Sequence, residues 1–275
     1  MRKMKKAVNV CFWYIVFSYC ILSNLCVAKA DSDGDDCEIG IAAVGDYSDW
    51  NDLNDLSSPI QINKDITEAF SNKKAKKWKI GFRRINTALT KDVFVAVSLG
   101  GKDNQYADNV DLMIYSGHGL LPNKHGSDDY AFALDYDGKK QYAKQGQMYL
   151  GNKDLEWLVT FTCNFCNGGL KKVGRLAKGI HAVCGYSTRV LLVPTMGKTF
   201  AGKLKNGVSV KEAFLSTAKE TQPWKDSVTH PERTAAVFTT KSCANDCIWG
   251  YGSVASDPKA YSKDSSQYIM YTYKY

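Results

Sequence analysis

The residues Asp111–Gly119 (DLMIYSGHG) place an apolar run directly before a Gly-His-Gly turn. A second apolar run, Trp157–Asn164 (WLVTFTCN), leads into a cysteine in the same way. Short apolar runs bounded by turn residues are typical of buried strands in α/β proteins. The two stretches therefore predict two buried strands, each with a reactive side chain at its carboxyl end: His118 after the first and Cys163 after the second.

Further apolar runs predict strands at residues 37–47, 93–99, 180–186 and 234–240, and a hairpin around 131–137 and 141–150. Apolar residues at three- and four-residue spacings predict helices at 64–89, 170–177, 195–204 and 210–220. Buried strands that alternate with helices predict an α/β fold. We expect a mostly parallel central sheet of about six strands, covered on both faces.

Length and composition exclude two broad classes of protein. The chain has 275 residues, of which 44% are apolar, so it can build a core and is not disordered over most of its length. Only one long apolar stretch exists, at the very start, which excludes a polytopic membrane protein. One large domain or two small ones fit this length.

The first 30 residues have the three-part pattern of a secretory signal peptide. A basic start is followed by an apolar run from Ala7 to about Val27 and by the small-x-small site Ala28-Lys29-Ala30. The alternative is an uncleaved membrane anchor. We expect cleavage after Ala30, a secreted or periplasmic protein, and no membrane contact after cleavage. The remaining chain divides into an acidic linker (31–37), an α/β domain (38–242) and a Tyr-rich C-terminal extension packed on it (243–275).

Signal cleavage changes the charge and the cysteine count. Residues 1–30 carry five Lys or Arg and no acid, so the net charge falls from +8 to +3. That charge is too small to predict a nucleic-acid partner. Six cysteines remain of nine. The four histidines lack the paired spacing of zinc ligands, so the sequence predicts neither a metal site nor a cofactor.

His118 and Cys163 predict nucleophilic catalysis if their strands are neighbours in the sheet. Neighbouring strands lie about 4.8 Å apart, and ligand sites in α/β sheets lie at the carboxyl ends of the strands. The imidazole would take the thiol proton, and the thiolate would attack a carbonyl carbon. A helix starting just after Cys163 would lower the thiol pKa. The amides of Gly119 and Cys163 are the candidate oxyanion hole.

In this order and at this spacing, the two motifs resemble those of the caspase-haemoglobinase superfamily of cysteine peptidases, which includes caspases, legumains, gingipains and clostripains. The resemblance covers about residues 38–240. It implies a three-layer sandwich, a peptide or protein substrate, and catalysis by His118 as base and Cys163 as nucleophile. It sets no oligomeric state.

The resemblance also implies a pocket for the residue before the scissile bond. Part of that pocket lies two residues before the cysteine, where this chain has Phe161 and the family often has an acid or a glutamine. Another part follows the next strand, where Ser187 and Arg189 stand, and Arg189 would recognise an acidic side chain. Asp46, at the end of the first predicted strand, is a further candidate for substrate binding.

Two other functions stay open on the cysteine pattern. Cys37, Cys166, Cys184, Cys243 and Cys247 are candidates for disulfides in an oxidising compartment, with Cys166–Cys184 and Cys243–Cys247 as natural pairs or Cys37 joining one of the last two. If Cys163 is also bridged, the fold would serve as an inactive binding protein. Alternatively, Cys163-Asn164-Phe165-Cys166 is a Cys-x-x-Cys motif after a strand, as in thiol oxidoreductases.

Overall fold

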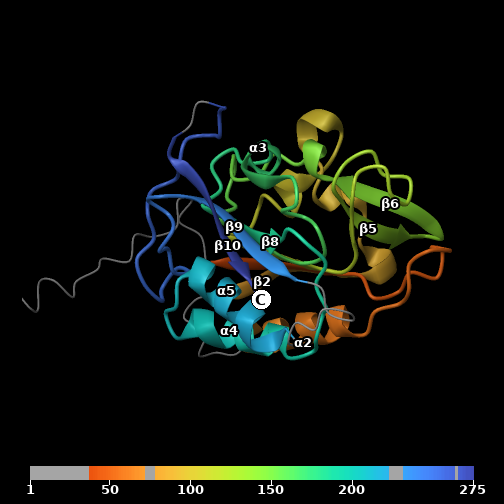
Figure 1. The fold of residues 1–275 in the computed structure, drawn as a ribbon, viewed down its shortest axis with the longest axis horizontal. Helices are drawn as coiled ribbons and strands as arrows, with labels where there is room; N and C mark the ends of the chain where they lie inside the picture. The colour runs from red at the N-terminus through yellow and green to blue at the C-terminus, as the bar shows by residue number, and fades with distance from the viewer. Residues whose placement is uncertain (1–36, 72–77, 223–231, 264–265) are drawn as a thin grey trace, which may run out of the picture.

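A computed structural model describes residues 37–71, 78–222, 232–263 and 266–275 (Figure 1). The predicted signal peptide and residues 31–36 of the acidic linker lie outside these ranges. Within the described ranges, no helix is long and apolar enough to cross a membrane.

A seven-stranded sheet forms the centre of the molecule, with the strand order β10-β9-β8-β7-β3-β1-β2. From β8 to β2 the strands are parallel, whereas β9 is antiparallel to β8 and β10 is antiparallel to β9. The strands span β1 (Glu38–Ala43), β2 (Lys79–Ile85), β3 (Leu112–Ser116), β7 (Trp157–Phe161), β8 (Ala182–Tyr186), β9 (Thr234–Thr240) and β10 (Tyr268–Lys274). This confirms a mixed α/β fold with a large, mostly parallel central sheet.

The sheet separates two cores. On one face lie the helices α2 (Ser58–Ser71), α4 (Met196–Lys205) and α5 (Val210–Thr221) (Figure 1). The other face carries α3 (Gly169–Gly174) and a small antiparallel sheet of β4 (Gly119–Leu120), β5 (Ala131–Tyr136) and β6 (Lys139–Lys144). Side chains alternate between the faces, as the two-residue period of a strand requires. In β3, Leu112 and Ile114 face the helices, while Met113 and Tyr115 face the small sheet.

Two predicted elements are wrong. The predicted helix at 64–89 ends at Ser71, and Lys79–Ile85 is the parallel edge strand β2, paired with β1. A register shift in its pairing with β1 lies between Ile80 and Phe82, so Ile80 packs on the helical face of the sheet and Phe82 on the other face. The predicted strand at 93–99 consists of 3-10 turns, because Phe94 N–H and Leu99 N–H donate to carbonyls three residues back.

The other predicted elements are present. The helices predicted at 195–204 and 210–220 are α4 and α5, and the predicted hairpin is β5 and β6. The helix predicted at 170–177 is the short α3. The Tyr-rich C-terminal segment contributes the edge strand β10, which pairs with β9 from Tyr268–Thr240 to Lys274–Thr234.

Candidate active site

His118 and Cys163 occupy matched positions at the carboxyl edge of the sheet. Strands β3 and β7 are parallel neighbours in a register that pairs Ser116 with Phe161. Gly117 N–H then donates to Phe161 O at 3.3 Å, just beyond the last strand pair. His118 and Cys163 each follow that last pair by two residues. Because side chains alternate between the two faces of a strand, both positions correspond to the same face of the sheet.

Gly119 brings the two turns into direct contact. A Cβ atom added to Gly119 would lie 2.0 Å from the carbonyl oxygen of Cys163 and 2.6 Å from Thr162 Oγ1. No side chain tolerates such a distance, so only glycine allows the turn after β3 to approach the turn after β7 this closely.

Two buried tyrosines hold the backbone of His118. Tyr47 Oη accepts from His118 N–H at 2.7 Å, and Tyr115 Oη donates to His118 O at 3.3 Å. The Tyr47 ring also packs edge-on against the imidazole, with 4.6 Å between ring centroids. Tyr47 follows β1 and Tyr115 lies in β3, so residues from two neighbouring parallel strands position this histidine. The sequence analysis missed both tyrosines, since nothing in their spacing sets them apart from core residues.

The imidazole of His118 is oriented by a backbone carbonyl. Nε2 lies 2.9 Å from Asn54 O. A carbonyl can only accept, so Nε2 carries the hydrogen and Nδ1 keeps the lone pair. Burial lowers the pKa of His118 below its usual value, although the bond to Asn54 opposes this. The neutral, proton-accepting form therefore dominates at neutral pH.

The thiol of Cys163 is half-buried and contacts the segment after β8. Its Sγ accepts from Val190 N–H at 3.3 Å and lies 3.6 Å from Val190 O. Burial raises the pKa of the Cys163 thiol, and the bond from Val190 and the charges of Arg189 and Arg233 only partly offset this. The expected lowering by a helix end is wrong, because α3 begins only at Gly169.

Within the described residues no hydrogen bond joins His118 to Cys163: the imidazole bonds Asn54 and the thiol bonds Val190. The resting pair is thus a neutral imidazole and a neutral thiol with separate partners.

Two backbone amides at this edge are available as donors. Ala133 N–H donates to His118 O, which makes residues 118 and 133 a hydrogen-bonded pair of the small antiparallel sheet. Gly119 and Phe132 are then a non-hydrogen-bonded pair, and the Gly119 amide points away from β5. In the described part of the chain, the Cys163 amide donates no hydrogen bond either. These are the two amides that the sequence analysis names as the oxyanion hole.

Several polar residues lie beside the Cys163 thiol. Asn164, in a left-handed conformation (φ 61°), donates its N–H to Thr188 O. Gln222 bonds Leu191 through both its side-chain atoms, and its Oε1 also accepts from Arg233 Nη1 at 3.1 Å. Arg189 is exposed, and its charge acts on the thiol together with that of Arg233. The sequence analysis named Arg189 but missed Arg233 and Gln222.

Two buried hydroxyls lie in the same neighbourhood. Among the residues that the structure describes, Tyr186 Oη and Tyr275 Oη have no hydrogen-bond partner. Burial raises the pKa of both tyrosines, and the charges of Cys163 and Arg233 act on each.

The remaining predicted pocket residues differ in their placement. Phe161 is completely buried among the helices, with its ring centroid 5.7 Å from that of Phe200, so it cannot contact a substrate and this prediction is wrong. Ser187 is half-buried beside the polar residues next to Cys163, and its Oγ donates to Thr234 O at 3.4 Å. Asp46 is exposed and accepts from Ser48 N–H.

The described cysteines are buried thiols rather than bridges. Cys163, Cys166, Cys184, Cys243 and Cys247 are free, and Cys37 is buried in the helical-face core. Cys166 and Cys184 belong to the two different cores, on opposite faces of the sheet, which argues against a bond between them. Burial raises the pKa of Cys166 to about 12, so this thiol is a poor partner for redox exchange at Cys163.

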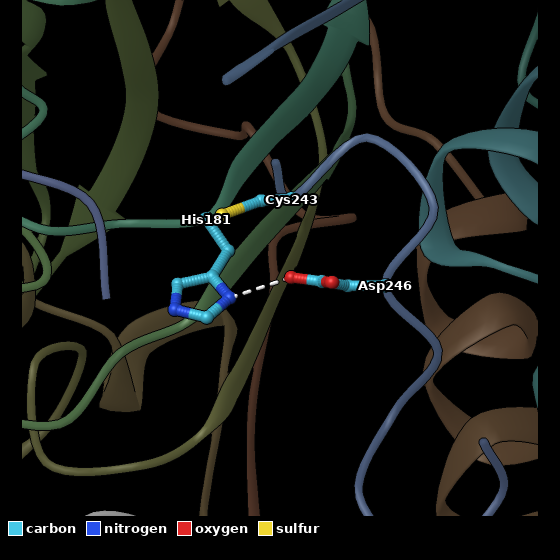
Figure 2. A group of neighbouring side chains, drawn as sticks. All are labelled: His181, Cys243 and Asp246. Atoms are coloured by element: carbon cyan, nitrogen blue, oxygen red, sulfur yellow. Dashed lines mark hydrogen bonds and ion pairs between the residues drawn. The ribbon is translucent and has the colours of Figure 1, made fainter. Parts of the chain in front are cut away.

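A second cluster of reactive side chains lies at the opposite edge of the sheet. His181 precedes β8, and Cys243 and Asp246 follow the antiparallel β9, so all three lie at the same edge (Figure 2). Asp246 Oδ2 lies 2.7 Å from His181 Nδ1, and both side chains are buried. Burial opposes the charged imidazole, but the bonds to Asp246 and Cys243 outweigh it and raise the pKa of His181 to about 10.

One family profile covers most of the chain. A family profile described as a domain of unknown function, DUF6345, matches residues 43–272, and the chain belongs to this family. The matched range includes both candidate clusters. A comparison with curated proteins found no match.

Proposed function

We propose that this DUF6345 protein is a secreted cysteine endopeptidase that resembles the caspase-haemoglobinase superfamily. The observation that carries the proposal is the β3–β7 register, which gives His118 and Cys163 matched positions at the carboxyl edge of adjacent parallel strands. The contact between Gly119 and the Cys163 carbonyl strengthens it, because it keeps the two turns together. The three-layer arrangement around a mostly parallel sheet is in keeping with a caspase-like fold.

In the proposed reaction, His118 Nδ1 takes the proton of the Cys163 thiol as Sγ attacks the carbonyl carbon of the peptide bond. The amides of Gly119 and Cys163 stabilise the oxyanion of the tetrahedral intermediate. The carbon–nitrogen bond then breaks, and the imidazolium gives its proton to the leaving amine. A water molecule, deprotonated by His118, hydrolyses the thioester and regenerates the thiol.

The third member of the site is a carbonyl rather than a carboxylate. Asn54 O holds Nε2–H and thereby directs the lone pair of Nδ1 away from Asn54. A neutral carbonyl stabilises an imidazolium less than a carboxylate does, and the bond to Asn54 does not outweigh the burial that lowers the pKa of His118. Proton transfer thus accompanies substrate attack and does not precede it.

Arg189 and Arg233 suggest the substrate preference. Both charges act on the thiol, and Gln222 fixes the Arg233 guanidinium. Guanidinium groups recognise carboxylates through two parallel hydrogen bonds. We propose that the residue before the scissile bond is acidic, and that its carboxylate is bound near Arg233.

Replacing Cys163 by Ala in the full chain tests the proposal directly. Hydrolysis of a mixed peptide library, followed by mass spectrometry, is expected in the wild type and reduced by at least about 10³-fold in the variant, because the nucleophile is gone. His118→Ala is expected to cause a similar loss. Cys247→Ala is the matched control, since its thiol donates to Gly207 O away from this edge and activity is expected to persist.

Activity that survives Cys163→Ala would contradict the peptidase. A wild type that folds and carries a free Cys163 thiol, yet cleaves no member of the library, would contradict it too and favour the inactive binding protein. Circular dichroism of each variant separates loss of chemistry from loss of fold.

A further inference from the structure

The cluster at the sheet edge opposite Cys163 has the composition of a metal site. A ring nitrogen of His181, Cys243 Sγ and a carboxylate oxygen of Asp246 all lie within 4.8 Å of one another, and all three residues are buried (Figure 2). Among the described residues this is the one such group of His, Cys, Asp or Glu. We propose that His181, Cys243 and Asp246 bind a zinc ion. The site is independent of the proposed peptidase activity.

The ligand types select zinc among the common metal ions. Imidazole nitrogen, thiolate sulfur and carboxylate oxygen are the three ligands that zinc takes in proteins, at about 2.0–2.3 Å. Calcium and magnesium bind oxygen ligands and do not select a thiolate. Three protein ligands leave one position of a tetrahedron for a water molecule.

The charges of the site balance when zinc is bound. Zinc would enter as the imidazole Nδ1 and the thiol each release a proton, because both must be deprotonated to act as ligands. One thiolate and one carboxylate then neutralise the divalent ion. A buried site with no net charge avoids the large cost of burying an unpaired charge.

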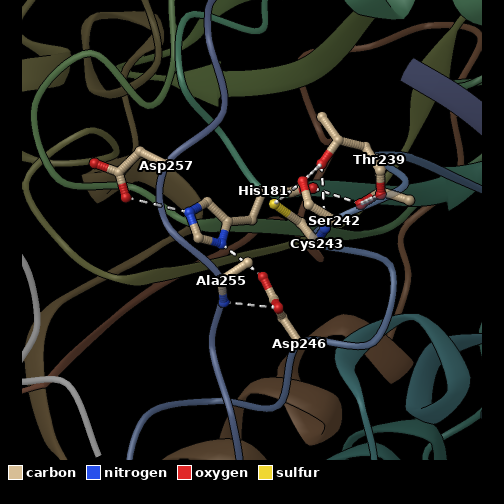
Figure 3. A network of polar contacts seen from close by, with 8 residues as sticks. His181, Thr239, Ser242, Cys243, Asp246, Ala255 and Asp257 are labelled. Atoms are coloured by element: carbon tan, nitrogen blue, oxygen red, sulfur yellow. Dashed lines mark hydrogen bonds and ion pairs between the residues drawn. The ribbon is translucent and has the colours of Figure 1, made fainter. Parts of the chain in front are cut away.

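Two of the three ligands, His181 and Asp246, are already oriented by neighbouring groups (Figure 3). On the far side of the imidazole, His181 Nε2 lies 3.3 Å from Asp257, which leaves Nδ1 for the metal. The second carboxylate oxygen of Asp246 accepts from Ala255 N–H at 2.9 Å. A carboxylate on the second nitrogen of a ligating histidine is the usual outer-shell partner of zinc sites.

The sequence places these ligands at a spacing that a motif search does not find. Cys243 and Asp246 are three residues apart in the turn after β9, and His181 precedes β8. The antiparallel β8–β9 pairing brings the two ends together, with Ala182 opposite Thr239. A zinc ion bound to His181, Cys243 and Asp246 would link the segment from Cys243 to Asp257 to the start of β8.

Metal binding to the full chain tests the proposal. We expect the purified protein, loaded with ZnCl₂ and dialysed, to retain about one zinc per chain by elemental mass spectrometry. Cys243→Ala and Asp246→Asn are expected to lower the retained zinc by at least about tenfold, since each removes a ligand. Cys247→Ala is the control from the same segment and is expected to retain the ion.

A spectroscopic measurement on the unmodified protein avoids the effect of substitutions on folding. Loading with CoCl₂ is expected to give the near-ultraviolet charge-transfer band of a cobalt–thiolate bond, and this band is expected to disappear when zinc is added. Absence of the band in the folded wild type would overturn the proposal and leave a buried ion pair of His181 and Asp246. Equal zinc retention by wild type and Cys243→Ala would overturn it as well.

Discussion

At the scale of single residues, the candidate active site depends on one close backbone contact. Gly119 approaches the Cys163 carbonyl more closely than any side chain permits. This contact aligns the two turns that carry His118 and Cys163, whereas the side chains themselves form hydrogen bonds with other residues. Backbone contacts therefore bring the two turns together, although the side chains of His118 and Cys163 are not hydrogen-bonded to each other.

Gly119→Ala is expected to destabilise the protein by about 1–3 kcal/mol, because the added methyl group forces the two turns apart. The midpoint of urea unfolding measures the change. Gly202→Ala is the matched control: it lies in α4 with no atom within 4 Å of an added Cβ. There, alanine is expected to stabilise by about 0.5–1 kcal/mol. Equal effects at the two positions would contradict the role given to Gly119.

Arg233 is expected to set the preference for an acidic residue before the scissile bond. Arg233→Gln should lower kcat/KM for such substrates by about 10- to 100-fold, the effect of losing a hydrogen bond between charged groups. Neutral substrates should change little. Arg175→Gln, exposed after α3, serves as the control. An unchanged ratio of kcat/KM between acidic and neutral substrates would remove Arg233 from the pocket.

The sequence predicts the candidate site residues that directly follow strands, but not the residues that hold them in position. His118 and Cys163 stand directly after apolar runs, so the strand ends locate them. Tyr47, Asn54 and Arg233 reach the site through tertiary contacts from distant segments, which no local pattern encodes. Phe161 shows the converse error, because position relative to Cys163 does not reveal which face of β7 is covered by helices.

At the scale of elements, amphipathic helices were predictable and edge strands were not. The spacing in α4 and α5 has one apolar stripe, which packs on a single face of the sheet. Strand β2 is only half-buried at an edge, and its apolar residues also fit a helical spacing. Its identity comes from the parallel pairing with β1, a non-local interaction.

Helix α5 begins with a capping interaction whose contribution can be measured. Ser209 accepts through its side chain from Glu212 N–H at 3.4 Å, the Ser-x-x-Glu arrangement of a capping box. Ser209→Ala is expected to destabilise by about 1 kcal/mol in thermal or urea unfolding. Ser216→Ala on the same helix removes hydrogen bonds to the carbonyls of Glu212 and Ala213 within the helix and should be close to neutral. A larger loss for Ser216→Ala would contradict this account of the helix.

At the scale of the whole molecule, the two candidate clusters lie at opposite edges of one sheet. The Cys163 edge collects the carboxyl ends of parallel strands, where ligands bind in open α/β sheets. The His181 edge gathers the start of β8 and the end of β9. A change at one cluster is thus expected to leave the other intact, since rigid strands separate them.

Stability should decrease as pH rises, and Asp108 contributes to this. Its buried carboxyl accepts from Gly151 N–H and Lys153 N–H, and burial raises its pKa from 3.8 to about 7. The protonated form is favoured by folding, so its stabilisation is complete below about pH 4 and is lost by about pH 7. Three pKa units correspond to about 4 kcal/mol.

Asp108→Asn is expected to remove this contribution, because the amide stays uncharged. The free energy of unfolding, measured in urea at pH 5 and pH 8, should then fall less between the two values than in the wild type. Asp137→Asn, exposed in the β5–β6 turn, should keep the wild-type dependence. Identical pH dependences for wild type and Asp108→Asn would show that the carboxyl is charged in the fold at both pH values.

The strand order also sets the timing of assembly during synthesis. Strands β3 and β7 can pair as soon as residue 161 has been made, whereas Gln222 and Arg233 arrive later, with α5 and β9. At roughly 5–20 residues per second, several seconds separate these events on the ribosome. During that interval Gln222 and Arg233 do not yet cover the Cys163 thiol, which can react with any oxidant or thiol in its compartment. The ribosome therefore makes Cys163 before it makes Arg233, the residue proposed to select the substrate.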